Sequence, residues 1–272
     1  MKRARLAAYL AGCAVAMLAT GAQAQGSAQD EIAKYREMLQ DANPAELLIA
    51  RGEDLWKQKR GPKNASLERC DLGLGAGVVK GAYAQLPRHF ADTNEVMDFE
   101  ARLVYCMVTL QGFDRAEVTK KPFSGTGQRQ TDIEAITTFV VDQSRGIPVR
   151  ISQSHPMERA AFERGRQLFN MRGGPYDFSC ATCHGVDGQR IRLQDLPNIS
   201  HNKQDAARAF TTWPAYRVSQ GALRTMQWRL NDCFRQQRFP EPIFASQSTI
   251  DLITFLGVNA EGAKMDSPAI KR

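Results

Sequence analysis

Cys180-Ala181-Thr182-Cys183-His184 is the most informative stretch of this 272-residue chain. Two thiols three residues apart can reach the two vinyl groups of one porphyrin edge, and the histidine that follows can bind the iron. The stretch therefore predicts covalent attachment of haem c through Cys180 and Cys183, with His184 as the proximal iron ligand. A thioredoxin-type redox pair or half of a zinc site would need no following histidine, and no second Cys-x-x-Cys supplies further zinc ligands.

The first 24 residues have the pattern of an export signal. Three basic residues precede an apolar run that ends at Ala22-Gln23-Ala24, the small-x-small pattern of signal peptidase cleavage. The run is shorter than the roughly 20 residues that a transmembrane helix needs, and Cys13 lies inside it, which disfavours a lipoprotein site. We expect residues 1–24 to be removed and residues 25–272 to reach the periplasm, with no membrane span.

The charge of the chain excludes one class of partner. The formal net charge of +7 includes the three basic residues of the signal. The remaining excess is small, and no basic tract has interleaved aromatic residues, so we expect no binding to nucleic acid.

The chain contains an internal repeat. A set of residues in the first half recurs 113 residues later in the second half. The first set is Arg51-Gly52-x-x-Leu55-Trp56, Gly61-Pro62, Cys70 and Gly75. In the same order, the second set is Arg164-Gly165-x-x-Leu168-Phe169, Gly174-Pro175, Cys183 and Gly188. Two shorter matches set Arg102-Leu103-x-x-Cys106 against Arg229-Leu230-x-x-Cys233, and Thr138-Phe139-Val140 against Thr254-Phe255-Leu256. Short matches can arise by chance between helical sequences, but several at one offset favour duplication.

The first copy has lost its haem-binding residues. In this alignment Leu67 stands at the position of Cys180, and Asp71 stands at the position of His184. One thioether anchor and the iron ligand are therefore missing, and we expect only one haem, in the second copy.

The apolar spacing predicts an all-α fold with long loops. Segments 131–140 and 246–257 have helical periodicity, and 158–169 reads as an amphipathic helix that packs on the last one. The polar segment 142–148 contains both Gly and Pro, which suits a linker. We expect two cytochrome c-like domains, at residues 25–150 and 151–272.

The sixth iron ligand separates an electron carrier from an enzyme, because electron-transfer cytochromes typically use Met or His there. The downstream candidates are Met226, Met265, His201 and Cys233. His201 stands in a polar loop, and Met265 follows the last predicted helix in an expected loose tail. Spacing alone does not separate Met226 from Cys233. Trp213, just upstream, is interpreted as a packing residue.

The segment around Cys233 is basic. Residues 221–238 hold four arginines and one acid, a field that lowers a thiol pKa and attracts anions. If the segment is helical, Arg229 and Cys233 lie one turn apart on one face. A guanidinium matches a sulfonate or sulfate by bidentate hydrogen bonding. The alternative is a buried cysteine beside a solvated basic face.

This segment also carries a family resemblance. Gln227-Trp228-Arg229-Leu230-Asn231-Asp232-Cys233-Phe234-Arg235-Gln236-Gln237-Arg238, with Pro240-Glu241-Pro242, resembles the active-site stretch of the SoxA family, the catalytic subunits of the SoxAX cytochromes that initiate bacterial thiosulfate oxidation. Residues 81–87 and 106–112 agree as well, and the likeness covers essentially the whole chain after the signal.

The resemblance implies roles for individual residues. Cys180 and Cys183 would attach haem, and His184 and Cys233 would bind its iron axially. Cys233 would be the catalytic residue, found in this family as a persulfide, and Arg229 would hold the sulfonate end of thiosulfate.

The resemblance also implies a disulfide. The sequence is similar to the one-haem members of the family and departs from the two-haem members at Leu67 and Asp71. In one-haem members a disulfide staples the domain without haem, and Cys70 with Cys106 is the pair that this chain offers.

The reaction implied by the family joins thiosulfate to a cysteine of the carrier SoxY, within SoxYZ, with loss of two electrons. These would pass through the haem to the partner cytochrome SoxX, in a heterodimer, and on to a soluble cytochrome c. The competing interpretation is a plain electron-transfer cytochrome with Met226 as distal ligand.

Overall fold

The computed structural model describes residues 34–35, 37–38, 43–191 and 194–271. Asn43–Arg272 pack together as one compact unit, to which all that follows refers. The predicted signal, residues 1–24, lies outside the described residues. Among the described helices, none combines the length and the apolar character that a membrane crossing requires.

The first half of this unit is built from short helices and one hairpin. Its elements, in chain order, are α3 (Ala45–Lys57), η1 (Tyr83–Gln85), β1 (Arg88–Phe90), β2 (Glu95–Met97), α4 (Phe99–Thr109), α5 (Arg115–Thr119) and α6 (Asp132–Asp142). Helix α6 confirms the helix predicted over 131–140. It begins with a capping box in which the Thr131 hydroxyl accepts from the Glu134 N–H and the Glu134 carboxylate accepts from the Thr131 N–H.

The second half carries the Cys-x-x-Cys-His stretch. Its elements are α7 (Pro156–Asn170), α8 (Cys180–His184), β3 (Arg190–Ile191), β4 (Gln194–Asp195), α9 (Lys203–Thr211), β5 (Ala215–Arg217), η2 (Val218–Gln220), β6 (Ala222–Arg224), α10 (Met226–Gln236), α11 (Gln247–Asn259) and β7 (Ala269–Lys271). Helices α7 and α11 confirm those predicted over 158–169 and 246–257. A small sheet of order β6-β5-β7, with β7 parallel to β5, was not expected from the sequence.

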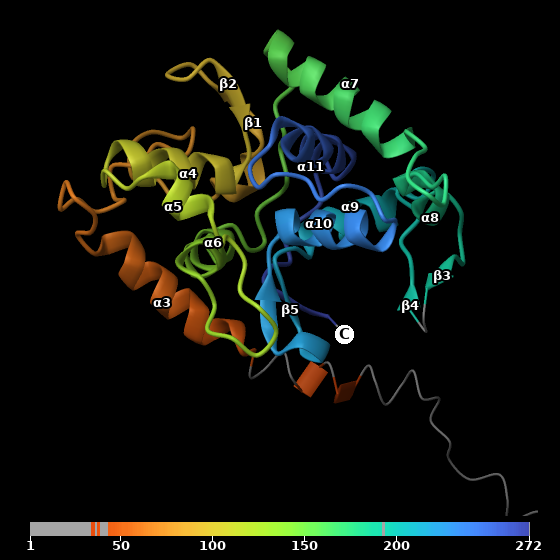
Figure 1. The fold of residues 1–272 in the computed structure, drawn as a ribbon, viewed down its shortest axis with the longest axis horizontal. Coiled ribbons are helices and arrows are strands. Elements are labelled where there is room, and N and C mark those ends of the chain that lie inside the picture. The colour runs from red at the N-terminus through yellow and green to blue at the C-terminus, as the bar shows by residue number, and fades with distance from the viewer. Residues whose placement is uncertain (1–33, 36, 39–42, 192–193, 272) are drawn as a thin grey trace, which may run out of the picture. The chain divides into compact units, whose positions relative to one another are not determined.

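The duplication is visible in how the helices cross. In Figure 1, α3 lies against α6 in the first half and α7 lies against α11 in the second. A Cβ on Gly52 would stand 2.1 Å from the Ala135 carbonyl oxygen, and one on Gly165 would stand 2.0 Å from that of Asp251. Both pairs of helices therefore touch backbone to backbone at the matched glycine, and the two halves share one plan of crossing helices.

The matched aromatic residues close the same crossings. The rings of Trp56 and Phe139 have centroids 6.4 Å apart, and the rings of Phe169 and Phe255 have centroids 5.0 Å apart. The Gly, aromatic and Phe positions of the sequence repeat thus have the same structural meaning in both halves.

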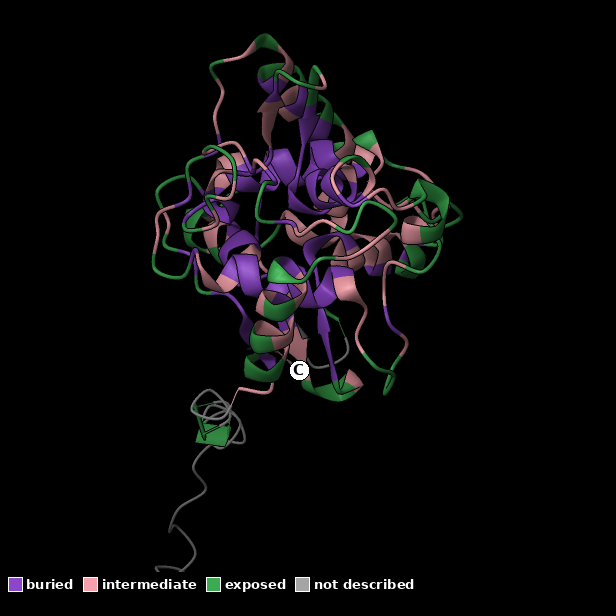
Figure 2. Ribbon diagram, turned by 90° about the vertical axis from the view of Figure 1, so that its left-hand side faces the viewer, coloured by how far each residue is buried: buried purple, intermediate pink, exposed green. Residues whose placement is uncertain are grey.

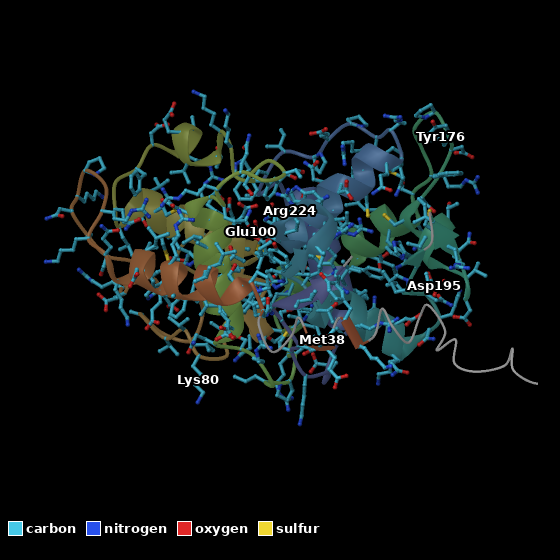
Figure 3. The ribbon with its side chains drawn as sticks, turned by 90° about the horizontal axis from the view of Figure 1, so that it is seen from below. Met38, Lys80, Glu100, Tyr176, Asp195 and Arg224 are labelled. Carbon is cyan, nitrogen blue, oxygen red and sulfur yellow. A yellow bond between two sulfur atoms is a disulfide. The ribbon has the colours of Figure 1, made fainter. Side chains whose placement is uncertain are left out.

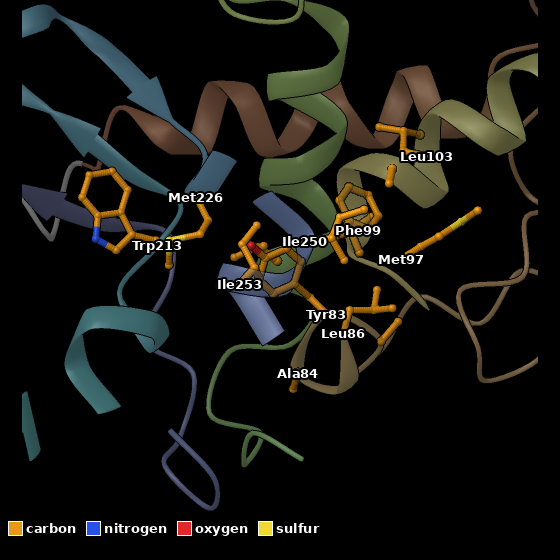
Figure 4. Close-up of a cluster of buried hydrophobic side chains, with 14 of the residues drawn as sticks. Tyr83, Ala84, Leu86, Met97, Phe99, Leu103, Trp213, Met226, Ile250 and Ile253 are labelled. Atoms are coloured by element: carbon orange, nitrogen blue, oxygen red, sulfur yellow. The ribbon is translucent and has the colours of Figure 1, made fainter. Parts of the chain in front are cut away.

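The two halves share one hydrophobic core. Figure 4 shows Tyr83 and Phe99 of the first half beside Ile250, Ile253 and Met226 of the second. Figure 2 shows buried residues running through the interior of the unit rather than separating into two groups. The apolar surface of each half is therefore covered in part by the other.

The chain between the halves is tightly held. The fully buried Val149 donates its N–H to the Ala263 carbonyl oxygen at 2.8 Å, and Arg150 donates to that of Ala84 at 2.8 Å. The expectation that Met265 stands in a loose tail is wrong. Met265 is only 2% exposed, and its N–H donates to the Ile147 carbonyl oxygen. The boundary near residue 150 stays a prediction.

Candidate functional site

Helix α8 presents the two cysteines of the motif. Ser179 caps the helix, since its hydroxyl accepts from the Thr182 N–H at 3.1 Å. Cys180 and Cys183 both carry free thiols, whereas Cys70 and Cys106 are joined to each other. The helix packs on α7, so α7 and the cap fix the positions of the two thiols.

His184 is held as an iron ligand would be. Its Nδ1 lies 2.9 Å from the Pro197 carbonyl oxygen, and because a carbonyl only accepts, Nδ1 carries the hydrogen and leaves the Nε2 lone pair free. Burial lowers the pKa of His184, so the imidazole is neutral at neutral pH. A neutral imidazole with a free Nε2 is the form that binds a metal.

The surroundings of α8 are apolar and open. Several large hydrophobic side chains on either side of it are exposed to solvent, namely Met171, Tyr176, Phe178, Val186 and Ile191. Figure 3 shows Tyr176 at the outer edge of this region. Two free thiols, a preset imidazole and an apolar surround together fit haem c, whose porphyrin is largely apolar.

Helix α10 carries Arg229 and Cys233 one turn apart. Thr225 caps it by accepting from the Trp228 N–H. Arg229 donates to Asp232 Oδ2 at 3.0 Å, and its guanidinium carbon lies 5.8 Å from the centroid of the Trp213 ring. The predicted helix is present from Met226 onwards, so the expectation that Arg229 and Cys233 share a face is confirmed.

The charges of Arg229 and Cys233 act on residues of α8. Burial and then the charge of Cys233 raise the pKa of Cys180 to about 12, and the same two causes raise the pKa of Cys183. The charge of Arg229 adds to burial in lowering the pKa of His184. Such effects require short separations, so the five residues named from the sequence converge on one place.

The other candidate ligands lie elsewhere. Met226 is 3% exposed and packs in the core with Trp213 and Ile250, as Figure 4 shows. Met265 is buried and hydrogen-bonded to Ile147, and His201 is exposed. Cys233 is the candidate whose charge acts on both cysteines of the attachment helix.

In the first half, the corresponding positions are occupied by the protein itself. The disulfide expected from the resemblance, Cys70–Cys106, is present, and Leu67 is fully buried. Arg102, the counterpart of Arg229, donates to the Asp71 carbonyl oxygen at 2.7 Å and lies over the ring of Phe90 at 4.0 Å. Arg102 therefore contributes to packing, because its guanidinium lies inside the domain.

Sequence reasoning missed a cluster of cations beside Cys233. Arg217 is the last residue of strand β5, and Lys271 is the last residue of strand β7. The two residues stand opposite each other in the pairing of these strands. Lys271 Nζ lies 5.6 Å from the centroid of the Trp213 ring. Trp213 is buried as a packing residue, as expected, but its ring also has Arg229 and Lys271 against it. The strands are three residues long, so no periodicity could have revealed the cluster.

A buried support under α10 was missed as well. The Gln227 side chain donates to Asp98 Oδ2 at 2.6 Å and accepts from the Ala245 N–H at 2.8 Å. Its N–H points at Glu100 Oε1, 3.4 Å away. Arg224, the residue that precedes the cap of α10, lies 3.5 Å from the buried Glu134 of the first half. The first half thus holds the start of the helix that carries Arg229 and Cys233.

Comparison with known protein families agrees with this arrangement. Residues 51–149 match the model described as "SoxA/TsdA, cytochrome c domain", and residues 162–256 match the model described as "Cytochrome c". The fold is similar to that in the crystal structure of SoxXA from P. pantotrophus, with a TM-score of 0.71 at 22% identity, over 88% of this chain and 84% of that one.

Two curated relatives are more similar in sequence. The L-cysteine S-thiosulfotransferase subunit SoxA of Hydrogenophilus thermoluteolus is 50% identical over 89% of this chain and 87% of the relative. A protein of the same name from Hydrogenobacter thermophilus is 31% identical over 91% of each chain. The likeness spans both halves, including the one without the haem-attachment residues. The chain therefore belongs to the SoxA family of L-cysteine S-thiosulfotransferase subunits.

Proposed function

We propose that this chain is the catalytic cytochrome subunit of an L-cysteine S-thiosulfotransferase, which couples thiosulfate oxidatively to a cysteine of the carrier SoxY within SoxYZ. The observation that carries the proposal is the placement of Arg229 and Cys233 on one face of α10, with Cys233 within electrostatic reach of the cysteines of α8. A cation one turn from a sulfur nucleophile suits an anionic sulfur substrate. The names of the curated relatives support the same activity.

Cys180 and Cys183 would attach one haem c in the second half, and His184 and Cys233 would bind its iron. When bound, it supplies a one-electron acceptor next to the reacting sulfur. In the first half, Leu67 and the disulfide between Cys70 and Cys106 are buried in the core, which supports a count of one. The haem domain is residues 151–272, and the domain without haem is 25–150.

The reaction forms one sulfur–sulfur bond in each of two steps. The outer sulfur of thiosulfate bonds to the sulfur of the Cys233 thiol, with loss of two electrons and of the thiol proton. The thiol of the carrier cysteine then attacks that outer sulfur and displaces Cys233, which takes up the released proton. Arg229 holds the sulfonate throughout, with its guanidinium positioned by Asp232.

The two electrons need an acceptor, and the proposal names it by class. A partner cytochrome, SoxX, forms a heterodimer with this chain and passes the electrons to a soluble cytochrome c. The structural likeness to a chain of SoxXA supports such a pairing. The export signal at residues 1–24 supports a periplasmic location, where a soluble cytochrome c is available.

The test compares two substitutions on α10. Cys233→Ala should retain covalent haem but lose thiosulfate-dependent coupling to the carrier, and the wild-type peptide with Cys233 should carry the mass of an extra sulfur. Met226→Leu, the matched control, should keep both the activity and the thiolate signature in electron paramagnetic resonance. Wild-type activity in Cys233→Ala, or a signature that changes with Met226→Leu, would favour the electron carrier with Met226 as ligand.

A further inference from the structure

The small sheet next to α10 places its cations on one face. In the register of β5 with its neighbours, Arg217 stands opposite Ala222 and Lys271, and Ala215 stands opposite Arg224 and Ala269. Residues directly opposite each other share a face, and successive residues alternate. One face therefore holds three alanines and three cations, while the other holds Tyr216, Leu223 and Ile270.

Arg224 is fully committed to other partners. It donates to the Ser124 carbonyl oxygen at 2.6 Å and to Gln220 at 2.7 Å, lies 3.5 Å from the buried Glu134 carboxylate, and has its guanidinium over the Trp228 ring. Its charge is neutralised inside the protein, and it has a structural part to play.

Arg217 differs from Arg224 in this respect. Its Nε is buried and has no hydrogen-bond partner among the described residues. Leaving a buried N–H unpaired is unfavourable, so the Arg217 guanidinium is available to a ligand that supplies an acceptor. Burial and then the charge of Arg229 lower the pKa of Arg217, while Cys233 acts in the opposite direction. Arg217 therefore lies within electrostatic reach of both residues.

Several cations gather at this place among the described residues. Arg229 and Lys271 both approach the Trp213 ring, and Arg217 is next to Lys271 on the neighbouring strand. The carboxylate that faces Arg217 and Arg229 is Asp232, which also accepts hydrogen bonds from Arg235 and Gln236. Like charges on paired strands repel each other, so an anion between the cations would stabilise the arrangement.

We propose that Arg217 is a second sulfonate-binding residue, which together with Arg229 grips the oxygen end of thiosulfate and directs its outer sulfur to Cys233. The inference rests on the proposed function and adds to it the residue that completes the anion site. Lys271 contributes charge at the rim. The ligands are anions with a terminal sulfonate or sulfate group.

Two guanidinium groups suit this ligand better than one does. A sulfonate has three oxygens, and one guanidinium can pair with two of them. A second guanidinium from another direction takes the third and fixes the rotation of the anion, which a single fork leaves free. Hydrosulfide has no such oxygens, so the pair of arginines favours thiosulfate over it.

The kinetic test uses Arg217→Gln in the assembled, haem-loaded complex. Losing one charge-assisted hydrogen bond made before and during reaction should raise KM for thiosulfate about tenfold or more and leave kcat within a few fold. Arg208→Gln, which removes an exposed cation from α9, should leave both constants unchanged. Covalent haem and thermal unfolding should match wild type in both variants. An Arg217→Gln enzyme with wild-type KM overturns the inference.

A second measurement does not depend on turnover. Alkylation at Cys233 by anionic iodoacetate and by neutral iodoacetamide is followed by peptide mass spectrometry of the holoprotein. Arg217→Gln should lower the iodoacetate rate severalfold relative to the iodoacetamide rate, and sulfate should protect wild type more than the variant. An unchanged ratio sinks the anion site. A changed ratio in a protein that does not turn over thiosulfate sinks the proposed function alone.

Discussion

Asp98 and Glu100 form a pair of buried carboxyl groups below the start of α10. Both are almost fully buried, and Glu100 Oε2 has no hydrogen-bond partner among the described residues. Burial raises the pKa of Asp98 to about 6, although hydrogen bonds from Ala101 and Gln227 act in the opposite direction. Burial and then the charge of Asp98 raise the pKa of Glu100 well above its ordinary value. The buried Tyr83 and Glu134 also face this pair.

This pair makes the stability of the protein depend on pH. A carboxyl whose pKa is raised in the folded state stabilises it fully below the unfolded pKa of about 4, and this stabilisation is lost as pH rises through the folded pKa. For Asp98 the loss falls between about pH 4 and pH 6–7 and amounts to roughly 3 kcal/mol. Asp98→Asn should remove much of it, so the free energy of unfolding should fall less between pH 5 and pH 7.5 than in wild type.

Denaturant titrations at the two pH values measure this difference. Asp114→Asn is the control, because Asp114 also caps a helix through its side chain but is exposed. It should leave the pH dependence of wild type intact. If Asp98→Asn keeps the full pH dependence, the carboxyl pair is not its source.

At the scale of single elements, α7 and α11 touch through Gly165. A Cβ there would meet the Asp251 carbonyl oxygen at 2.0 Å and Phe255 Cβ at 2.9 Å. Helix propensity alone favours Gly165→Ala by about 1 kcal/mol, but backbone cannot yield as a flexible side chain can. We expect Gly165→Ala to destabilise the protein by at least about 2 kcal/mol and to separate α7 from α11.

Chemical denaturation of the holoprotein checks the sign. Ala160→Gly, at an exposed position of the same helix, should cost only about 1 kcal/mol, as propensity dictates. Gly52→Ala should behave like Gly165→Ala, because its Cβ would meet the Ala135 carbonyl oxygen. Stabilisation by Gly165→Ala would show that the crossing is looser than described.

The helices could be predicted from the sequence, but the short strands could not. Helices α6, α7 and α11 are long enough for their apolar period to be visible, and the repeated Gly and Phe positions mark where they cross. Strands β5 to β7 have three residues each, and β7 pairs with a strand more than 50 residues earlier in the chain. The role of Arg217 depends on this strand pairing, and the role of Asp98 depends on its contact with Gln227. Neither contact produces a pattern in the local sequence.

For the whole molecule, the first half supports the half with the Cys-x-x-Cys-His motif. The two halves share one core and meet at buried polar contacts that include Asp98 with Gln227 and Glu134 with Arg224. Both contacts reach the strand, cap and first turn that position Arg229 and Cys233. The first half therefore holds the start of α10 in place through these contacts.

The disulfide in the first half should then stabilise the distant motif. It spans 36 residues, and closing such a loop is worth about 4 kcal/mol in the chain-entropy model. In Cys70→Ser/Cys106→Ser, we expect the midpoint of unfolding to fall by roughly 10 °C. Because the halves share a core, circular dichroism of the helices and of the haem band should shift together. A haem band that melts at the wild-type temperature while half of the helix signal melts earlier would mean that the halves unfold independently, and that the first half does not hold α10 in place.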